Sequence, residues 1–297
     1  MKILKPQFEI WQQPAGENGM FQQIERAGRV CYKSEKNMTA ESARPFCQRM
    51  INNQHYAMLE HGTVYLTIPL TDKEAVSWYR THAHVKTNTD GENAYVTTNL
   101  RVIVENKRED DVKRYLTEPT RLHERRVTVH FSTQIAITRE FNRHRVDSIA
   151  EQSTRYCNYA KDKFGNEIAL SLPAWVEQEA AKEERTLGSD CTLSDDDFLV
   201  LAGRVARGEA GALDNWLFAN LAAERAYLNL IRVGRKPQEA RVVLPLDTNT
   251  ELVHTAFVSD WSHFFDLRAL DKTGPAHPDA KAIALPLYEE MKREGLL

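Results

Sequence analysis

Apolar and polar residues change period several times in the first seventy residues of the chain. Apolar residues recur at helical spacing over residues 18–32, which predicts a helix. A second helix is predicted to begin at Thr39, whose hydroxyl could cap it, and to end at residues 52–53. Residues 63–69 are rich in β-branched and aromatic side chains and predict a strand. The chain therefore starts with helices that lead into a sheet.

Residues 71–122 have a pattern of their own. A short helix is predicted over residues 72–82, and a turn with Gly and Asn follows at 87–93. A strand rich in Val, Thr and Ile is predicted over residues 95–105, and a charged helix over 109–116. Because this segment is too short to bury its own core, we interpret it as an elaboration within a single domain that spans residues 1–297.

The second half of the chain carries the longer elements. Alternating apolar and polar residues predict a strand over residues 126–138. Residues 198–232 predict either one long helix or two helices that join near residues 208–211, and Ser194 could cap the start. The remaining predicted elements are strands at 168–172 and 250–257 and helices at 174–187, 237–245, 260–270 and 277–295. His277 is expected to act as a cap or surface residue at the start of the last helix.

Composition is that of a soluble globular protein, with 42% hydrophobic and 27% charged residues. The formal net charge of −3 argues against a protein that coats nucleic acid, so an anion site must come from a local basic cluster. No apolar run is long enough to span a bilayer, and the start of the chain lacks a signal region, so we expect a cytoplasmic protein.

Cysteine and glycine patterns exclude several common kinds of site. The four cysteines lie far apart without paired spacing, so we expect reduced thiols, with neither a disulfide frame nor a metal site; they are Cys31, Cys47, Cys157 and Cys191. The chain has no Gly-x-Gly-x-x-Gly loop and no phosphate-binding Gly-Lys-Thr loop. A dinucleotide would therefore not be bound in either of those ways.

The stretch from Arg143 to Tyr156 is the densest collection of hydrogen-bonding side chains. It holds three arginines, a histidine, two carboxylates, two serines and a threonine. Arginine forks and hydroxyls suit an anionic ligand with several oxygens. If Arg143, His144 and Arg145 were helical, they would point about 100° apart and could not all serve one ligand from one face. Either one arginine is structural, or the segment serves two surfaces, as at a subunit interface.

This stretch resembles the signature of the flavin-dependent thymidylate synthases, also known as thymidylate synthase complementing proteins. The matching residues are Arg-His-Arg, seven further residues and Ser153, followed by Thr-Arg-Tyr. Other segments occur in the order found in this family, namely 27–32, His55 with Glu60-His61, 238–246 and 264–268. The resemblance covers most of the chain outside the elaboration at 71–122, and residues 157–215 carry little of it.

The resemblance implies an α+β fold with a mixed or antiparallel sheet flanked by helices. It also implies a homotetramer whose active sites lie at subunit interfaces. The implied reaction is the reductive methylation of dUMP to dTMP. FAD would carry the methylene group and the hydride, methylenetetrahydrofolate would donate the carbon, and NADPH would be the reductant. No metal and no nucleic-acid or membrane partner is implied.

The resemblance also implies roles for individual residues. Those expected at FAD are His55, Glu60, Arg143, His144, Arg145, Glu151 and His263. Those expected at dUMP are Glu140, Glu151, Ser153, Thr154, Arg155, Arg241 and Arg268. Arg268 and Ser153 are the candidate catalytic residues, with Arg268 polarising the uracil ring. Ser153 has no evident general base beside it, so a phosphate ligand is favoured over a nucleophile. Cys157 is expected to be a structural neighbour.

Four positions differ from the family pattern and leave alternatives open: Ala57, Glu140, Ala150 and Phe257. A carboxylate at position 140 would repel a phosphate unless Arg139 or Arg143 neutralised it. One alternative is therefore a flavin-dependent C5 modification of another pyrimidine nucleotide, such as hydroxymethylation. Another is a flavin-free nucleotide- or RNA-binding protein on the same scaffold, which the negative charge and scattered aromatics disfavour.

Overall fold

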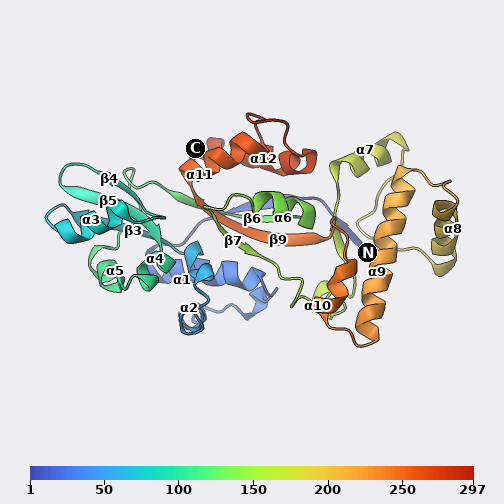
Figure 1. The fold of residues 1–297 in the computed structure, drawn as a ribbon, viewed down its shortest axis with the longest axis horizontal. Coiled ribbons are helices and arrows are strands. Elements are labelled where there is room, and N and C mark those ends of the chain that lie inside the picture. The colour runs from blue at the N-terminus through green and yellow to red at the C-terminus, as the bar shows by residue number, and fades with distance from the viewer.

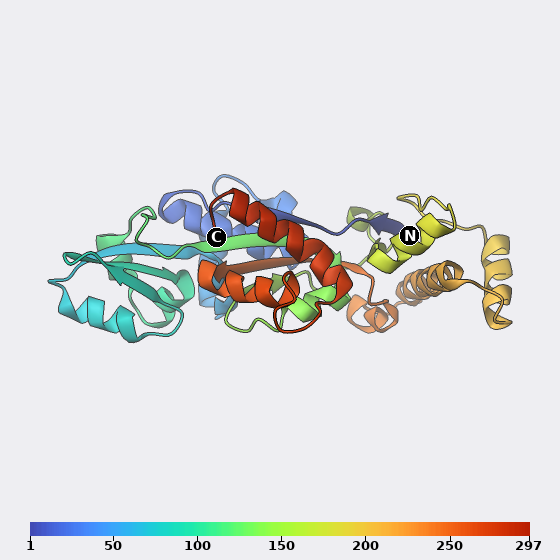
Figure 2. The same cartoon turned by 90° about the horizontal axis from the view of Figure 1, so that it is seen from above.

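The computed structural model describes all 297 residues, which form an elongated molecule with three regions along its long axis (Figures 1 and 2). A central antiparallel sheet carries helices on both faces. A second, smaller sheet lies at one end, and a mostly helical region lies at the other. None of the helices is both long and apolar enough to cross a membrane.

The central sheet has the strand order β2-β6-β9-β7, and every neighbouring pair is antiparallel. Its strands are β2 (Gln7–Trp11), β6 (Arg126–Gln134), β7 (Ser148–Glu151) and β9 (Asn249–Phe257). β6 and β9 pair along their whole length, from Arg126 opposite Phe257 to Gln134 opposite Asn249. The predicted α+β class with an antiparallel sheet and flanking helices is confirmed.

Helices cover the two faces of this sheet (Figure 1). On one face, α6 (Ile135–Phe141), α11 (Val258–Arg268) and α12 (Pro278–Arg293) pack on β6 and β9 around an aromatic core with Phe131, Trp261 and Phe264. The other face meets α1 (Gly16–Val30), which packs against α2 (Ala43–Asn52). Ala150 of β7 packs in a small apolar cluster with Ala27 and Val30 of α1.

The second sheet has the order β3-β5-β4 and is also antiparallel. It consists of β3 (Thr63–Pro69), β4 (Lys86–Thr89) and β5 (Asn93–Asn99), with helices α3 (Lys73–Thr81), α4 (Leu100–Glu105) and α5 (Glu109–Tyr115). Its core continues into α1 and α2 through Met20 and Phe46. Residues 71–122 thus extend the sheet of β3 and share a core with the N-terminal helices. The single-domain description of residues 1–297 stays a prediction.

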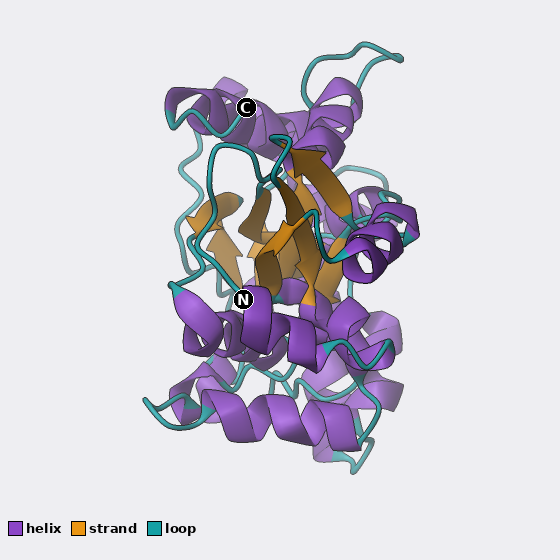
Figure 3. Ribbon diagram, turned by 90° about the vertical axis from the view of Figure 1, so that its left-hand side faces the viewer, coloured by secondary structure: helices purple, strands orange, loops and turns teal.

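The third region, on the right of Figure 1, is mostly helical. Figure 3 faces the opposite end of the molecule and shows helices above and below the strands. The elements of the third region are the parallel pair β1 (Lys2–Leu4) and β8 (Ala169–Ser171) and the helices α7 (Ala174–Lys182), α8 (Asp195–Ala206), α9 (Ala212–Arg232) and α10 (Pro237–Ala240). Of the two possibilities for 198–232, the structure has two helices, separated where Gly208 takes a φ of 72°. Ser194 caps α8, as predicted, because its Oγ accepts from the Asp197 N–H at 3.1 Å.

Several predicted boundaries are wrong for local reasons. The strand predicted over 95–105 ends at Asn99, whose side chain caps α4 by accepting from the Val102 N–H. The strand predicted over 126–138 ends at Gln134, where α6 begins. Thr39 caps no helix, since α2 starts at Ala43. Strands β1, β2, β4 and β7 were not predicted. Short 3-10 turns complete the chain at Glu35–Asn37, Tyr56–His61, Asp162–Phe164 and Arg241–Val243.

Candidate active site

The Arg-His-Arg segment lies in the turn between α6 and β7. Residues 142–147 form this turn and are not helical, so the geometric argument from helical spacing does not apply. The three side chains nevertheless face different ways: Arg143 and Arg145 are exposed, whereas His144 is buried. Arg143 and Arg145 make no side-chain hydrogen bond or ion pair within the chain. The segment therefore presents two arginines outward and anchors itself with the histidine.

A groove of ≈ 710 Å³ opens beside the second half of the signature. It is bounded by α6, by the residues that follow β7, and by the segment from Arg241 to Leu246. The polar residues in its wall are Arg139, Asn142, Glu151, Gln152, Ser153, Thr154 and Arg241. The structure thus brings together four of the seven residues predicted at dUMP, although Arg241 is almost ninety positions away in sequence.

Hydrogen bonds hold the polar groups of this groove in place. Both oxygens of the Glu151 carboxylate accept bonds, from Thr138 Oγ1 at 2.7 Å and from Asn142 Nδ2 at 3.2 Å. Arg241 Nη1 donates to Thr154 Oγ1 at 3.2 Å. The carboxylate is therefore fixed with two donors, while the exposed guanidinium of Arg241 keeps further donors free for a ligand.

Ser153 makes its hydrogen bonds to backbone groups. Its N–H donates to the Cys31 carbonyl at 2.9 Å, and its Oγ accepts from the Arg155 N–H at 3.3 Å. No histidine, lysine or carboxylate contacts this hydroxyl, so it has no general base, and a ligand-binding role fits it better than a nucleophilic one. Arg155 is exposed, with its guanidinium 5.4 Å from the centre of the Tyr156 ring, and it does not line the groove.

Arg268 lies in a different cluster from the groove. Its guanidinium forms an ion pair with the Glu140 carboxylate, donates to the Glu140 carbonyl at 2.8 Å and donates from Nε to His144 Nε2 at 3.3 Å. The arginine that pairs with Glu140 is Arg268, rather than Arg139 or Arg143. Arg139 of α6 and Asn142, which follows the helix, line the groove, whereas Glu140 points to the neighbouring face with Arg268.

Burial sets the protonation state of His144. Desolvation, together with the nearby His254, lowers the pKa of His144 to about 4. At neutral pH the ring is therefore uncharged, and Nε2 can accept the bond that Arg268 donates. His263, another residue predicted at FAD, is exposed, and its ring centre lies 5.9 Å from that of His144.

The remaining predicted flavin residues lie toward the small sheet. Glu60 accepts from Arg101 Nη1 at 2.6 Å at the edge of a cavity of ≈ 180 Å³, which Phe257 and Arg126 also line. His55 is exposed at the start of the 3-10 turn. Most of the predicted residues thus fall into three places on one chain: the groove, the cluster around Arg268, and the Glu60 cavity. Arg143, Arg145, Arg155 and His55 are exposed and lie in none of the three. No single site within one chain contains all of the predicted residues.

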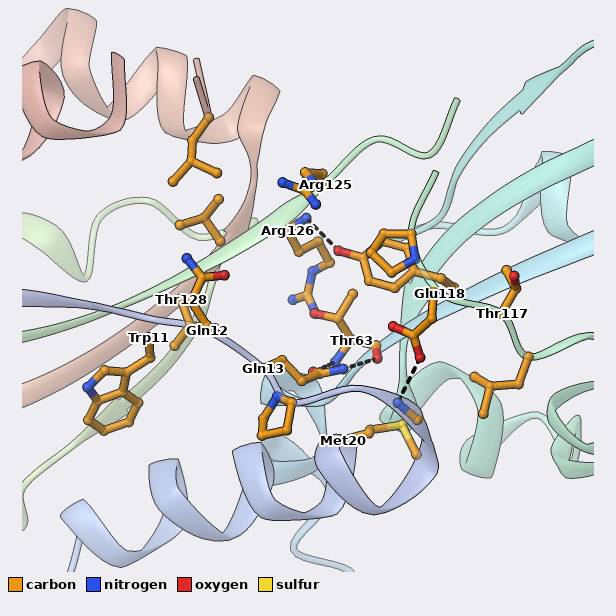
Figure 4. Close-up of a pocket in the computed structure, with 17 residues that line it drawn as sticks. Trp11, Gln12, Gln13, Met20, Thr63, Thr117, Glu118, Arg125, Arg126 and Thr128 are labelled. Atoms are coloured by element: carbon orange, nitrogen blue, oxygen red, sulfur yellow. Dashed lines mark hydrogen bonds between the residues drawn. The ribbon is translucent and has the colours of Figure 1, made fainter. Parts of the chain in front are cut away.

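A further cavity, of ≈ 150 Å³, lies between the β2–α1 loop and the start of β6 (Figure 4). It contains none of the residues predicted from the sequence. Its wall includes Arg126, which donates to the Glu60 carbonyl at 2.9 Å and to Ser148 Oγ at 2.9 Å. Burial lowers the pKa of Arg126 to about 10, because the guanidinium has little water and no carboxylate in contact.

Sequence reasoning missed the residues that support the site. Thr138 and Arg139 belong to α6, and Asn142 follows its last residue; a helix pattern through residues 135–142 would have placed the three near one face. Asp147 lies inside the signature, but its partner His254, 2.6 Å away on β9, leaves no local sequence signal.

All four cysteines are free thiols, and no group of three or more His, Cys, Asp or Glu side chains is arranged to hold a metal ion. Cys157 is fully buried, and desolvation raises its pKa to about 11. A thiol with that pKa is not an activated nucleophile at neutral pH, which agrees with the expected structural role.

Comparison with known proteins assigns the chain to a family. The model of the thymidylate synthase complementing protein family matches residues 112–294, more than half of the chain. The chain therefore belongs to this family, which confirms the resemblance found in the sequence. Two solved structures of the UMP/dUMP methylase PolB from Streptomyces cacaoi are also similar, one with 5-Br dUMP and one with 5-Br UMP.

Identity to these two structures is low. It is 18% and 17%, with TM-scores of 0.39 and 0.41, and each alignment covers 99% of this chain and 92% of the other. No curated protein matches the sequence.

Proposed function

We propose that this chain is a flavin-dependent thymidylate synthase that methylates dUMP to dTMP, with methylenetetrahydrofolate as carbon donor and NADPH as reductant. The observation that carries the proposal is the groove beside the family signature. It gathers Arg139, Arg241, Ser153 and Thr154 around a fixed Glu151 carboxylate. Guanidinium and hydroxyl donors suit a phosphate, and a fixed carboxylate suits a sugar hydroxyl or a ring N–H.

The exposed arginines of the turn fit the phosphates of a flavin dinucleotide. Arg143 and Arg145 have no carboxylate partner in the chain, and their forks match phosphate oxygens. His55, Glu60 and His263 would meet other parts of FAD. When bound, FAD would supply the hydride and carry the methylene group. Binding of the FAD phosphates would thus use two arginines, Arg143 and Arg145, that have no ion-pair partner in the chain.

Arg268 would stabilise negative charge on the uracil ring. Its side chain is 14% exposed, and a guanidinium in such a water-poor position stabilises developing charge strongly. Because Arg268 does not line the groove of its own chain, we propose that a neighbouring copy supplies it. The proposed assembly is a homotetramer with active sites between subunits.

A second candidate reaction follows from the ion pair between Arg268 and Glu140. A carboxylate bound to the guanidinium competes with the charge that the uracil ring would develop. This favours, as an alternative, a flavin-dependent C5 modification of another pyrimidine nucleotide, such as hydroxymethylation. Incubating the protein with UMP and with dUMP, and measuring the mass of each product, would distinguish the two reactions.

Flavin spectroscopy tests the proposed function. The purified protein, reconstituted with FAD, should show bound-flavin absorbance, and dUMP should then perturb that spectrum. A protein that binds no FAD would exclude both flavin reactions and leave the flavin-free binding protein. A flavin spectrum that dUMP does not change would refute dUMP as the substrate.

A further inference from the structure

The turn that presents Arg143 and Arg145 has two side-chain anchors. Its backbone bonds are local, from Arg143 N–H to the Glu140 carbonyl, from His144 N–H to the Phe141 carbonyl and from Asp147 N–H to the His144 carbonyl. Neither arginine side chain helps to hold it. The position of the two guanidinium groups therefore depends on the buried side chains of His144 and Asp147.

Asp147 is bound to the centre of the sheet. Its Oδ2 lies 2.6 Å from Nε2 of His254, and the two side chains are 1% and 0% exposed. His254 belongs to the middle of β9, where it is paired with Val129 of β6 and Ile149 of β7. The histidine cannot move without disturbing three strands, so it gives the turn a rigid point of attachment.

His254 is itself packed firmly. Its ring centre lies 4.5 Å from that of Trp261 and 5.5 Å, edge to face, from that of Phe264, both on α11. The second anchor reaches the same helix: His144 packs on Phe264 with ring centres 4.9 Å apart and accepts from Arg268 Nε. The turn, β9 and α11 are thus joined through one buried cluster.

The pair is incompletely satisfied by the protein. Asp147 Oδ1 and His254 Nδ1 are both buried and have no hydrogen-bond partner. Neither side chain can exchange this contact for another one in the chain. The two residues therefore depend on each other, and replacing one leaves a buried polar group without its partner.

We propose that Asp147 and His254 are positioning residues, which hold the turn so that Arg143 and Arg145 face the flavin phosphates while His144 meets Arg268. This inference rests on the proposed flavin function. Neither residue contacts the ligand in this arrangement. They act through the turn, as supporting residues do when they orient a binding group.

The test compares Asp147→Asn, His254→Asn and the double variant in titrations with FAD. Each single change should weaken FAD binding by roughly tenfold, as is typical for supporting residues. The double change should be little worse than either single change, because the two side chains act as one unit. Arg143→Ala should weaken FAD binding without changing thermal stability, since this side chain is exposed and unpaired.

Asp111→Asn is the matched control. Asp111 of α5 is 8% exposed and accepts from Arg108 Nε at 2.6 Å, so the same chemical change breaks a comparably short carboxylate contact beside the small sheet. It should lower thermal stability and leave FAD affinity within twofold. If Asp147→Asn also left FAD affinity within twofold, or if both variants weakened FAD binding equally, the positioning role would be refuted.

Hydrogen exchange in the ligand-free protein separates this inference from the proposed function. Asp147→Asn should increase exchange of the amides of residues 143–147 by roughly tenfold relative to the core of the β6–β9 pair. If the wild-type protein bound no FAD, the proposed function would fail, and unchanged exchange in the turn would still refute the anchoring.

Discussion

Arg268 contacts both the side chain and the backbone of Glu140: its guanidinium pairs with the Glu140 carboxylate and donates to the Glu140 carbonyl at 2.8 Å. The contact joins the end of α11 to the end of α6, immediately before the signature turn. The guanidinium predicted to act on uracil is thus already oriented in one chain. The same guanidinium also donates from Nε to His144, which fixes its orientation further.

The first prediction concerns Arg268 itself. Arg268→Ala should retain bound flavin but lower turnover by roughly a hundredfold or more, because the charge on the uracil ring would lose its stabilising group. The absorbance of bound flavin and the rate of dTMP formation measure the two effects. Turnover equal to that of the wild type would remove Arg268 from the mechanism.

The second prediction concerns the groove. Arg241→Ala should weaken dUMP binding roughly tenfold to a hundredfold, since a charged hydrogen bond to a phosphate is lost. Arg235→Ala is the control. Arg235 is an exposed arginine just before α10, as Arg241 is just after it, and it makes only a loose 3.9 Å pair with Glu239. Calorimetric titration with dUMP measures both variants. Equal affinities for dUMP would show that the groove does not bind the phosphate.

The fold and the groove differ in how much of them the sequence could predict. Ser194 has a local signal, and the α8 cap was predicted correctly. The break near Gly208 was one of two possibilities that the sequence left open, and the role of Ser153 stays a proposal. Asn99 ends a strand by capping a helix, and an alternating pattern does not reveal that competition. Boundaries set by caps therefore appeared only in the structure.

Contacts between residues far apart in the chain could not be predicted from the sequence, for a different reason. Arg241 reaches Thr154, and Arg268 reaches Glu140, only because the strands of the central sheet bring distant segments together. The family resemblance named these residues, but it did not reveal which of them share a surface. His254 carried no sequence signal at all, since its partner Asp147 lies more than a hundred residues earlier.

The third prediction concerns acid stability. The pKa of His144 is lowered to about 4 and that of His61 to about 3, in both cases mainly by burial. Below pH 6.5 these two histidines bind protons in the unfolded chain but remain neutral in the folded chain. The free energy of unfolding should therefore fall as pH drops from 6.5 toward 4 and 3. The combined loss should be several kcal/mol, about 1.4 kcal/mol for each unit of pKa shift.

Urea unfolding at a series of pH values measures this loss. His144→Gln should flatten the part of the curve between pH 6.5 and 4 while leaving the contribution of His61 in place. An unfolding free energy that stays constant from pH 6.5 to pH 4 would show that these histidines titrate normally in the folded protein.

The fourth prediction tests whether two copies share a site. Arg241→Ala and Arg268→Ala should each have little activity at low dUMP concentration, because one lacks the phosphate contact and the other the contact to uracil. When the two are dissociated together and reassembled, some interfaces should combine an intact groove with an intact Arg268. Recovery of about a quarter of the wild-type activity is expected for random mixing of shared sites. No recovery would place both residues in one chain's site.

The most direct test of the central claim is the product formed from dUMP. The protein is incubated with FAD, NADPH, methylenetetrahydrofolate and dUMP, and the nucleotide is analysed by mass spectrometry. A nucleotide heavier than dUMP by one CH2 group, formed only when all components are present, is expected. Unchanged dUMP, in a protein that binds both FAD and dUMP, would contradict it.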